Sequence, residues 1–365
     1  NFLMIRRPPR STHTQSRRQR QMCIRDSYYG IRGKHHSWIK SFLSGRTQRV
    51  IVDGQSSDSV DVLSGVPQGS VLGPILFLIF INDIPDGISS HIRLFADDCL
   101  LYRPILTPED NTALQNDLST LFEWSDTWQM KFNTSKCFIM NIHNTKLTSN
   151  HIYHMGGTPL ETVPSNPYLG VEFNNHLDWS PHIHNITARA HRLLGFLRRN
   201  LRKCPQSLRS KAYLSIVRPV VEYSSTVWSP HQIGLKTEIE MVQRKAARMV
   251  LNQPHRRDQR DSVSDMISSL GWESLESRRI KADLTMLYKT TNNLIKIPQQ
   301  YHPIPATRST RSNHEHKLQH IQASTNTYKF SLYPRTVPIW NEQPAELIEQ
   351  GSLEGFKGVL NTMTF

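Results

Sequence analysis

Apolar side chains recur at intervals of three and four residues along several stretches of the chain. In the clearest stretch, Leu114, Leu118 and Leu121 lie on one face of a predicted helix, and Phe122 extends that face. Thr107 and the proline and acidic residues after it are typical of a capped helix beginning. The same spacing predicts further helices over 38–43, 75–81, 183–197, 208–221, 239–250, 266–270 and 275–294.

Short runs with strand-like composition alternate with these predicted helices in the first half of the chain. Residues 48–52 and 60–62 are typical of two strands, with an Asp-Gly turn after the first. Residues 92–102 contain two apolar runs that flank a tight turn, which predicts a hairpin with Asp97 and Asp98 at or beside its turn. Strand composition returns in residues 131–140 and 168–171.

Two adjacent aspartates rarely stabilise such a turn, because each negative charge disfavours ionisation of the other. A bound divalent cation removes that penalty, and Mg²⁺ prefers carboxylate oxygens together with the phosphate oxygens of a substrate. Asp97 and Asp98 therefore indicate a metal site for phosphoryl transfer. The alternative is an ordinary solvated turn, and the neighbouring segments distinguish the two.

A loop rich in glycine and proline, residues 64–74, precedes a predicted helix. Gly65 and Gly69 permit backbone angles and close approaches that a side chain blocks, and Pro74 suits the first turn of a helix. The loop is either a strand-to-helix connector or a functional loop that lays its backbone and Gln68 against a nucleotide.

Lys136 and the glycine within residues 168–171 also have a structural and a functional interpretation. On the structural interpretation, Lys136 is an ordinary surface charge. The glycine inside the predicted strand 168–171 indicates a bulge or a close backbone contact.

The formal net charge of +14 is distributed unevenly along the chain. Residues 28–184 carry 10 Lys and Arg against 15 Asp and Glu, whereas residues 185–260 carry 16 against 4. An acidic block with the aspartate pair, followed by a basic block, suits a metal site beside a polyanion; a solvated helix face is the alternative. The candidate contacts to a nucleic-acid backbone are Arg189, Arg192, Arg198, Arg199, Arg202 and Lys203.

The four cysteines stand far apart in the sequence. This spacing argues for a reducing, intracellular setting, in the nucleus or the cytoplasm, and against a disulfide framework or a zinc module. The histidines at positions 314, 316 and 320 have no cysteine beside them, which argues against a metal site there. The longest apolar run, residues 75–81, is too short to span a bilayer, so no membrane partner is expected.

Residues 1–27 are rich in Arg, Ser and Gln and show no periodicity, which predicts disorder. The chain begins at Asn1, and two runs within this segment resemble translated adapter or vector sequence. A nucleic-acid-binding arm and a transit peptide are the biological alternatives. We set this segment apart from the expected fold as a translation artefact.

Four motifs in order resemble the reverse transcriptase of non-LTR retrotransposons, which are LINE-like elements. They are the glycine-proline loop 64–74, Phe95-Ala96-Asp97-Asp98, Asn133 with Lys136, and Tyr168 to Val171. Tyr333-Pro334-Arg335-Thr336, followed by Trp340-Asn341, resembles the carboxy-terminal end of the same elements. These features favour that family over the polymerases of group II introns and telomerase.

The resemblance implies an α+β fold class. Residues 28–175 would form part of a polymerase palm, an antiparallel sheet with packed helices. Residues 176–260 would form a basic, helical, thumb-like region. Residues 261–365 would form a helical carboxy-terminal region with a His- and Pro-rich linker.

The resemblance also implies a role for each motif residue in an RNA-directed DNA polymerase. Asp97 and Asp98 would bind metal, with two Mg²⁺ ions in a complete enzyme, and Lys136 would approach the triphosphate as a candidate proton donor. The expected partners are an RNA template, a DNA primer and deoxynucleoside triphosphates; the motifs imply no oligomeric state. The residues expected at the template and nucleotide are Gly65, Pro67, Gln68 and Gly69, and those expected at the primer end are Tyr168, Leu169 and Gly170.

The sequence departs from the family pattern at one essential carboxylate. A further aspartate normally precedes the glycine-proline loop, in a strand of the Phe-x-x-Asp type. Residues 28–63 offer only Asp53, Asp58 and Asp61, and none fits that pattern. We therefore expect an amino-terminally truncated copy without the fingers region, inactive on its own. The alternative is a non-catalytic remnant that binds nucleic acid through its basic helices.

Overall fold

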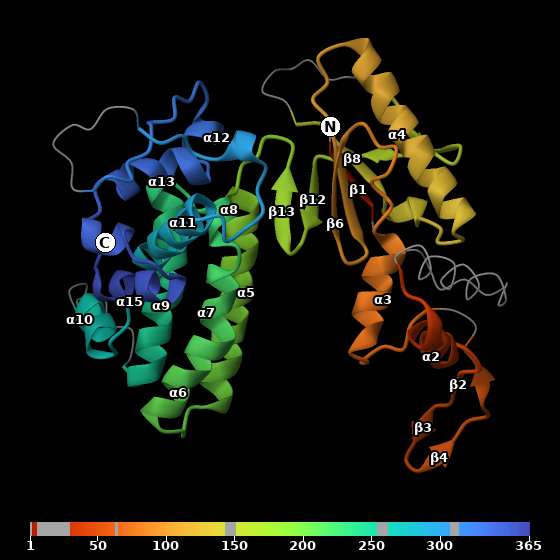
Figure 1. The fold of residues 1–365 in the computed structure, drawn as a ribbon. Helices are drawn as coiled ribbons and strands as arrows, with labels where there is room; N and C mark the ends of the chain where they lie inside the picture. Colours follow the sequence, from red (N-terminus) through yellow and green to blue (C-terminus); the bar gives the residue numbers. More distant parts are fainter. Residues whose placement is uncertain (1, 6–29, 63–64, 143–150, 254–261, 307–313) are drawn as a thin grey trace. The chain divides into compact units, whose positions relative to one another are not determined.

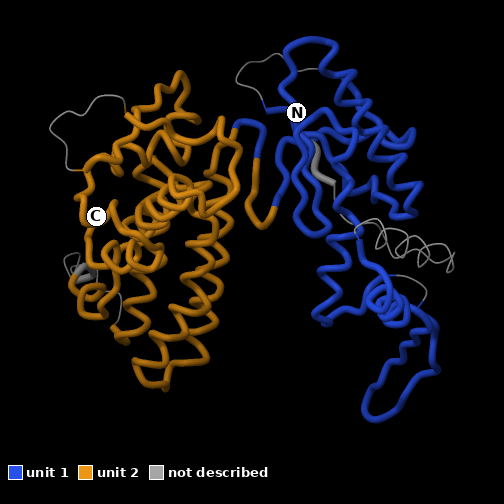
Figure 2. The backbone as a smooth tube through the Cα atoms, in the orientation of Figure 1, with its two compact units in different colours: residues 1–168, 174–176 blue, residues 169–173, 177–365 orange. Residues whose placement is uncertain are grey.

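The computed structural model describes residues 2–5, 30–62, 65–142, 151–253, 262–306 and 314–365. They form an α+β fold with two compact units, shown in Figure 2: unit 1 comprises residues 1–168 and 174–176, and unit 2 comprises residues 169–173 and 177–365. Within the described ranges, none of the helices combines the length and the apolarity needed to span a bilayer.

The main sheet of unit 1 has the strand order β11-β8-β1-β7-β6 (Figure 1). Neighbouring strands are antiparallel except β11 and β8, which are parallel. The predicted hairpin over residues 92–102 is confirmed as β6 and β7, with Phe95 opposite Asp98. The strands are β1 (Phe2–Ile5), β6 (His91–Phe95), β7 (Asp98–Tyr102), β8 (Phe138–Met140) and β11 (Glu161–Thr162).

The central strand β1 comes from the segment that the sequence analysis set apart. Residues 1–27 were expected to be disordered, but residues 2–5 pair on both sides, Phe2 with Tyr102 of β7 and with Met140 of β8. The physical reason is that an extended apolar run between two strands satisfies their backbone hydrogen-bonding groups. Residues 1 and 6–27 lie outside the described residues.

Helix α4 (Pro108–Thr127) lies beside this sheet in Figure 1. Leu114, Leu118 and Leu121 are buried and share one hydrophobic core with Leu101 of β7 and Ile139 of β8. The apolar spacing in the sequence therefore identified the packed face of this helix. That core fixes the strand that begins with Asp98 against α4.

The predicted beginning of α4 and the predicted burial of Phe122 can be compared with the structure. Thr107 and Asp110 form a capping box, with Pro108 in the first turn, so the predicted helix beginning is confirmed. Phe122 was expected in the core but is 37% exposed. Its ring instead covers Gly156, where an added Cβ would lie 2.2 Å from Phe122 Cε2.

Two small antiparallel ribbons follow α2 (Gly33–Leu43) in the chain. The ribbons pair β2 (Thr47–Gln48) with β5 (Val60–Asp61), and β3 (Ile51–Val52) with β4 (Gln55–Ser56). They confirm strand structure within residues 48–62, but the strand predicted over 48–52 is divided into β2 and β3, and β4 was not predicted. The ribbons lead through the glycine-proline loop to α3 (Leu72–Ile81). Ile39 and Leu43 of α2 pack against Leu76 of α3, which confirms both predicted helices.

The remaining strands of the described chain lie after α4. β9 (His154–Met155) pairs with β10 (Thr158–Pro159), and Met155 belongs to the same core as the main sheet. β12 (Ser165–Tyr168) and β13 (Val171–Asn174) form a two-stranded sheet.

The sequence analysis interpreted residues 168–171 as one short strand, and this interpretation is wrong. Leu169 and Gly170 instead form the turn between β12 and β13, with φ angles of +47° and +79°. Tight hairpin turns need left-handed backbone, which glycine adopts without strain. The glycine therefore indicates a turn, and neither a bulge nor a strand interior.

Unit 2 consists mainly of packed helices (Figure 1). Ile183, Val242 and Leu275 lie in one core, so unit 2 continues across residue 260, where the sequence analysis placed a boundary. Its main helices are α5 (Ser180–Asn200), α6 (Gln206–Ala212), η2 (Tyr213–Val217), α7 (Arg218–Glu222), α8 (Ser225–Trp228), α9 (Ile233–Leu251), α10 (Ser262–Ser269), α11 (Leu275–Thr291), α13 (Leu332–Asn341) and α15 (Leu353–Thr362). Shorter helices are η3 (Gln299–Tyr301), α12 (Asn326–Lys329) and α14 (Ala345–Ile348).

Three cysteines of the described residues are free thiols, Cys99, Cys137 and Cys204. Cys99 of β7 and Cys137, directly before β8, are both buried in the unit 1 core. Burial, and then the charge of Cys137, raise the pKa of the Cys99 thiol to about 12. Two cysteines that are distant in the sequence therefore share one core, on either side of β1.

Candidate active site

The turn of the β6–β7 hairpin presents the two adjacent aspartates. Ala96 and Asp97 form the two-residue turn, and Asp98 is the first residue of β7. Ala96 has a φ of +49°, the left-handed backbone that such a turn needs and that a residue with a Cβ adopts only with strain. Both aspartates are half-buried, so their carboxylates remain accessible at the end of the sheet.

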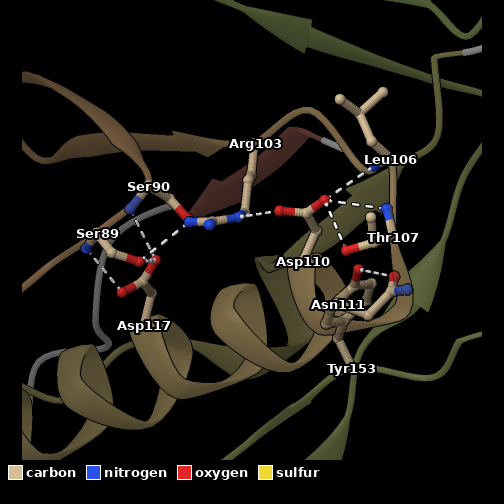
Figure 3. Close-up of polar contacts among 9 residues, drawn as sticks. All are labelled: Ser89, Ser90, Arg103, Leu106, Thr107, Asp110, Asn111, Asp117 and Tyr153. Atoms are coloured by element: carbon tan, nitrogen blue, oxygen red, sulfur yellow. Dashed lines mark hydrogen bonds and ion pairs between the residues drawn. The ribbon is translucent and has the colours of Figure 1, made fainter.

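Asp117 of α4 anchors the chain that leads into β6. Its carboxylate accepts hydrogen bonds from the backbone N–H groups of Ser89 and Ser90, at 2.9 and 2.8 Å, and from the Ser89 hydroxyl at 3.1 Å (Figure 3). Asp117 is 3% exposed, so these bonds replace water around a buried carboxylate. The sequence analysis missed this residue, although an aspartate between Leu114 and Leu118 on an apolar helix face is a visible signal.

Arg103 anchors the other end of the hairpin, directly after β7. Its Nε donates to Asp110 Oδ1 at 3.1 Å, and its Nη1 donates to Ser89 Oγ at 3.0 Å (Figure 3). Asp110 also accepts the backbone N–H groups of Leu106 and Thr107, both at 3.0 Å. These two backbone bonds, and then Arg103, lower the pKa of Asp110. The hairpin is therefore tied to α4 where it starts and where it ends.

Lys136 lies at the same end of the sheet as the aspartate pair. It is the last residue of η1 (Thr134–Lys136), it is exposed, and β8 starts two residues later. Strand β1 pairs Met4 with Phe138 and the next residue, Ile5, with Cys99, so the starts of β7 and β8 meet at one edge of the sheet. One strand separates them, which corresponds to about 10 Å between β7 and β8.

The structure around Lys136 differs from the predicted continuous strand over residues 131–140. Residues 134–136 form a 3₁₀ turn, because Asn133 Oδ1 accepts hydrogen bonds from the Ser135 N–H at 3.2 Å and from the Ser135 hydroxyl at 2.7 Å. Asparagine side chains compete in this way with strand hydrogen bonds. Only residues 138–140 form a strand.

Tyr168, the last residue of β12, is electrostatically coupled to Asp98. Burial, and then the negative charge of Asp98, raise the pKa of the Tyr168 hydroxyl; Cys99 adds to the effect and Arg93 opposes it. Because Coulomb interactions weaken with distance, this coupling indicates that the Tyr168 phenol lies near the Asp98 carboxylate. Of the three residues that the resemblance gives to the primer end, this one is near the carboxylates.

Leu169 and Gly170, the other two predicted primer-end residues, contact Tyr223, and all three belong to unit 2. The Tyr223 hydroxyl donates to the Leu169 carbonyl at 2.9 Å. A Cβ on Gly170 would lie 3.3 Å from Tyr223 Cε1, so the turn packs closely on that ring. Leu169 and Gly170 therefore have a structural role in the described contacts.

The glycine-proline loop is held by contacts with Arg46 and within itself. Arg46 Nη2 donates to the Gly65 carbonyl at 2.6 Å, and Ser70 Oγ donates to the Pro67 carbonyl at 2.7 Å. Gln68 is exposed. These contacts do not link the loop to the aspartate pair, so its approach to a nucleotide stays a prediction.

The glycines of this loop serve two different purposes. Gly65 and Gly69 have φ angles of +78° and +79°, which confirms that they supply backbone angles that a side chain disfavours. The close approach expected at these two positions occurs instead at Gly73 of α3. A Cβ there would lie 2.8 Å from the Pro67 carbonyl oxygen.

The carboxylate oxygens of the aspartate pair are the type of ligand that Mg²⁺ prefers. Mg²⁺ is commonly bound by one or two carboxylates, with water and substrate phosphates in the remaining positions. Asp97 and Asp98 supply two accessible carboxylates on adjacent residues. Within the described ranges, no group of three or more His, Cys, Asp or Glu side chains is placed to hold a metal ion.

The predicted nucleic-acid-binding residues lie on α5 and just after it, in unit 2. All six side chains are exposed, and the apolar residues between them, including Ala190, Leu194 and Leu197, are buried. The six are Arg189, Arg192, Arg198, Arg199, Arg202 and Lys203.

Among the described residues, the histidines of the predicted linker form no group of three or more side chains that could hold a metal ion. His314 is buried, its Nε2 lies 3.2 Å from the Trp340 carbonyl oxygen, and its ring packs edge-on against that indole. His316 and His320 are exposed. Burial lowers the pKa of His314, which is consistent with a core histidine.

Part of the chain matches a known protein family. The family model described as reverse transcriptase (RNA-dependent DNA polymerase) matches residues 25–173. This range contains the glycine-proline loop, the aspartate pair, Lys136 and Tyr168.

Curated proteins similar to this chain include several polymerases of mobile elements. The probable RNA-directed DNA polymerase from transposon BS of Drosophila melanogaster is 30% identical, over 62% of this chain and 26% of that protein. The RNA-directed DNA polymerase from mobile element jockey of the same species is 28% identical, over 62% and 26%. The Pol polyprotein from type-1 retrotransposable element R2 of Popillia japonica is 22% identical, over 61% and 38%.

This chain spans about a quarter of the length of the first of these relatives. The matching family model covers the segment that carries the aspartate hairpin. Residues 25–173 therefore match the reverse transcriptase family, and the chain is similar to the RNA-directed DNA polymerases of non-LTR retrotransposons.

Proposed function

We propose that this chain supplies the metal-binding and nucleic-acid-binding parts of an RNA-directed DNA polymerase. Unit 1 corresponds to part of the palm, and the basic helices of unit 2 correspond to the thumb. The observation that carries the proposal is that the starts of β7 and β8, with the aspartate pair and Lys136, meet at one edge of the sheet, and that Tyr168 is electrostatically coupled to Asp98. Its partners are an RNA template, a DNA primer and deoxynucleoside triphosphates.

The residues at this end of the sheet divide the work of nucleotidyl transfer. Asp97 and Asp98, on the hairpin between β6 and β7, would hold Mg²⁺. The chemistry that Mg²⁺ supplies there is acidification of the primer 3′-hydroxyl and neutralisation of charge on the triphosphate. Lys136 neutralises the leaving pyrophosphate and can donate a proton to it. Tyr168 offers its hydroxyl beside the primer end, and the pKa of that hydroxyl is raised by burial and then by the charge of Asp98.

Metal binding can be tested without polymerase activity, by titrating the full chain with Mn²⁺ and following free Mn²⁺ by electron paramagnetic resonance. Mn²⁺ is a suitable probe because it shares the preference of Mg²⁺ for carboxylate oxygens. We expect Asp97→Asn to weaken Mn²⁺ binding about tenfold, since one carboxylate charge is lost. Asp86→Asn, which changes an exposed aspartate outside the hairpin, should have no effect. Equal Mn²⁺ affinity in the wild type and Asp97→Asn would refute the assignment.

The chain on its own is proposed to lack polymerase activity. Two-metal catalysis needs carboxylates that converge on both ions, and Asp53, Asp58 and Asp61 lie on the small ribbons instead. The purified full chain should therefore give no Mg²⁺-dependent extension of a primer on an RNA template. Extension that Asp97→Asn abolishes would show that the carboxylate set is complete.

A non-catalytic, nucleic-acid-binding function is the second candidate. The exposure of all six predicted basic side chains on and after α5 favours it. Asp97→Asn distinguishes the two functions. The substitution should weaken Mn²⁺ binding, which belongs to the polymerase function, and leave binding to a primer-template, which belongs to the basic helices, unchanged.

A further inference from the structure

A cavity of about 550 Å³ lies in unit 2, between α5, α6 and the end of α9. A cavity of this size is in the range that small-molecule sites occupy. Its lining combines basic and apolar side chains from these three helices and the turns after them. The lining residues are His191, Leu194, Gly195, Arg198, Leu201, Arg202, Arg209, Lys245, Arg248, Met249, Asn252 and Gln253.

The charged lining residues all have the same sign. Arg198, Arg202, Arg209, Lys245 and Arg248 contribute cations, and none of the described lining residues is Asp or Glu. Cations gathered around one cavity repel each other and raise the local concentration of anions. Such a cavity selects a ligand that carries negative charge.

Two of these arginines contain buried donors that lack a hydrogen-bond partner among the described residues. They are Arg209 Nε and Arg248 Nη1. Arg209 is nevertheless held in place, because its Nη1 donates to the Met249 carbonyl at 3.1 Å. Buried polar groups are normally satisfied, so an unsatisfied pair in the wall of a basic cavity indicates acceptors supplied by a ligand.

The rest of the lining is apolar. Leu194, Leu201 and Met249 provide hydrophobic surface next to the cations, and Gly195 leaves that part of the wall without a side chain. A phosphate alone would contact only the basic part of the lining. A nucleotide would contact both parts, with its phosphate on the cations and its flat base on the apolar side chains.

We propose that this cavity binds a single nucleoside phosphate, with its phosphate on Arg209 and Arg248 and its base against Leu194 and Met249. The nucleotide is either one unpaired residue of a nucleic-acid strand or a free nucleotide. The proposal rests on the proposed function only for the class of ligand. It makes no use of the aspartate hairpin, so its test is independent of Mg²⁺.

The test measures binding of a fluorescently labelled, single-stranded oligoribonucleotide to the full chain by anisotropy, in EDTA. Lys245→Met removes an exposed cation that lines the cavity, and Lys211→Met removes an exposed cation of α6 that does not. We expect about fivefold weaker binding for Lys245→Met and less than a twofold change for Lys211→Met. Equal losses in both variants would mean a general charge effect and would overturn the proposal.

A second variant fills the cavity without a change of charge. A Cβ on Gly195 would meet only Arg199 Nη1, at 3.6 Å, and leucine is a better helix former than glycine, so Gly195→Leu should fold. We expect it to weaken binding at least fivefold, with an unchanged circular dichroism spectrum. Wild-type affinity in Gly195→Leu would contradict the proposal.

Competition with a free nucleoside monophosphate identifies the source of the nucleotide. Displacement of the labelled strand at micromolar concentration would assign the cavity to a free nucleotide. Resistance to displacement, together with the loss in Gly195→Leu, would assign it to a residue of the strand. Asp97→Asn should bind the strand like the wild type, which separates failure of this proposal from failure of the polymerase assignment.

Discussion

Single carboxylates hold the hairpin of this molecule in place. Asp117 contributes no chemistry to the candidate active site, yet it accepts three hydrogen bonds from the chain that enters β6. The position of Asp97 and Asp98 therefore depends on an aspartate about twenty residues later in the sequence.

Asp117→Asn should destabilise the protein, because the amide group turns one acceptor into a donor that faces backbone N–H groups. We expect the free energy of unfolding in urea to fall by about 2 kcal/mol, the usual cost of leaving buried groups unsatisfied. Asp126→Asn, at an exposed position of the same helix, is the matched control and should change it little. A small loss in Asp117→Asn would mean that the three bonds are not needed.

Asp110 should make stability depend on pH. Its pKa is lowered from 3.8 in the folded state by two backbone hydrogen bonds and by Arg103. Its contribution is therefore complete above that value and is lost as the pH falls through the lower, folded-state pKa. Asp110→Ala should be less stable than the wild type at neutral pH, and the difference should narrow towards pH 2. Ser119→Ala, which removes no titratable group, should give a difference that does not change with pH.

Some elements of the fold could be predicted from the sequence, and others could not. The α4 capping box and its leucine face, and the β6–β7 hairpin, were predicted because their determinants lie within a few residues of each other. Asp117 was missed because its partners lie 27 and 28 residues away. The turn at Leu169 and Gly170 was missed because composition alone does not distinguish a strand with a glycine from a hairpin.

The turn that carries the aspartates permits a test of its strain. Ala96 adopts a left-handed backbone, so Ala96→Gly should raise the free energy of unfolding by about 1 kcal/mol. Ala113→Gly, inside α4, should lower it by about the same amount, because glycine disfavours a helix interior. Thermal or urea unfolding of both variants measures the two signs. A destabilised Ala96→Gly would contradict the observed backbone conformation.

At the scale of the whole molecule, charge is divided along the chain. The acidic residues that include the aspartate pair belong to unit 1, and the basic helices belong to unit 2. Composition alone predicted this division, because net charge by segment needs no knowledge of the fold. The cavity of unit 2 was not predicted, since Arg209, Lys245 and Arg248 meet the α5 residues only through helix packing.

Nucleic-acid binding by the full chain should depend steeply on salt. If the six predicted cations each contact a phosphate, the logarithm of the association constant should fall with the logarithm of salt at a slope of about −4 to −5. Replacing Arg189 and Arg192 by glutamine should reduce the size of that slope by about 1 to 2. Affinity that does not change with salt would exclude backbone contacts as the main source of binding.

The buried thiol of Cys99 has a practical consequence for experiments on this protein. Only a thiolate reacts readily with alkylating reagents, and a thiol with a pKa of about 12 inside a core is protected from them. Labelling of Cys99 therefore has to wait until β7 separates from its neighbours. The rate of labelling then reports how often the strand that begins with Asp98 opens, which places a natural kinetic probe one residue from the candidate metal ligands.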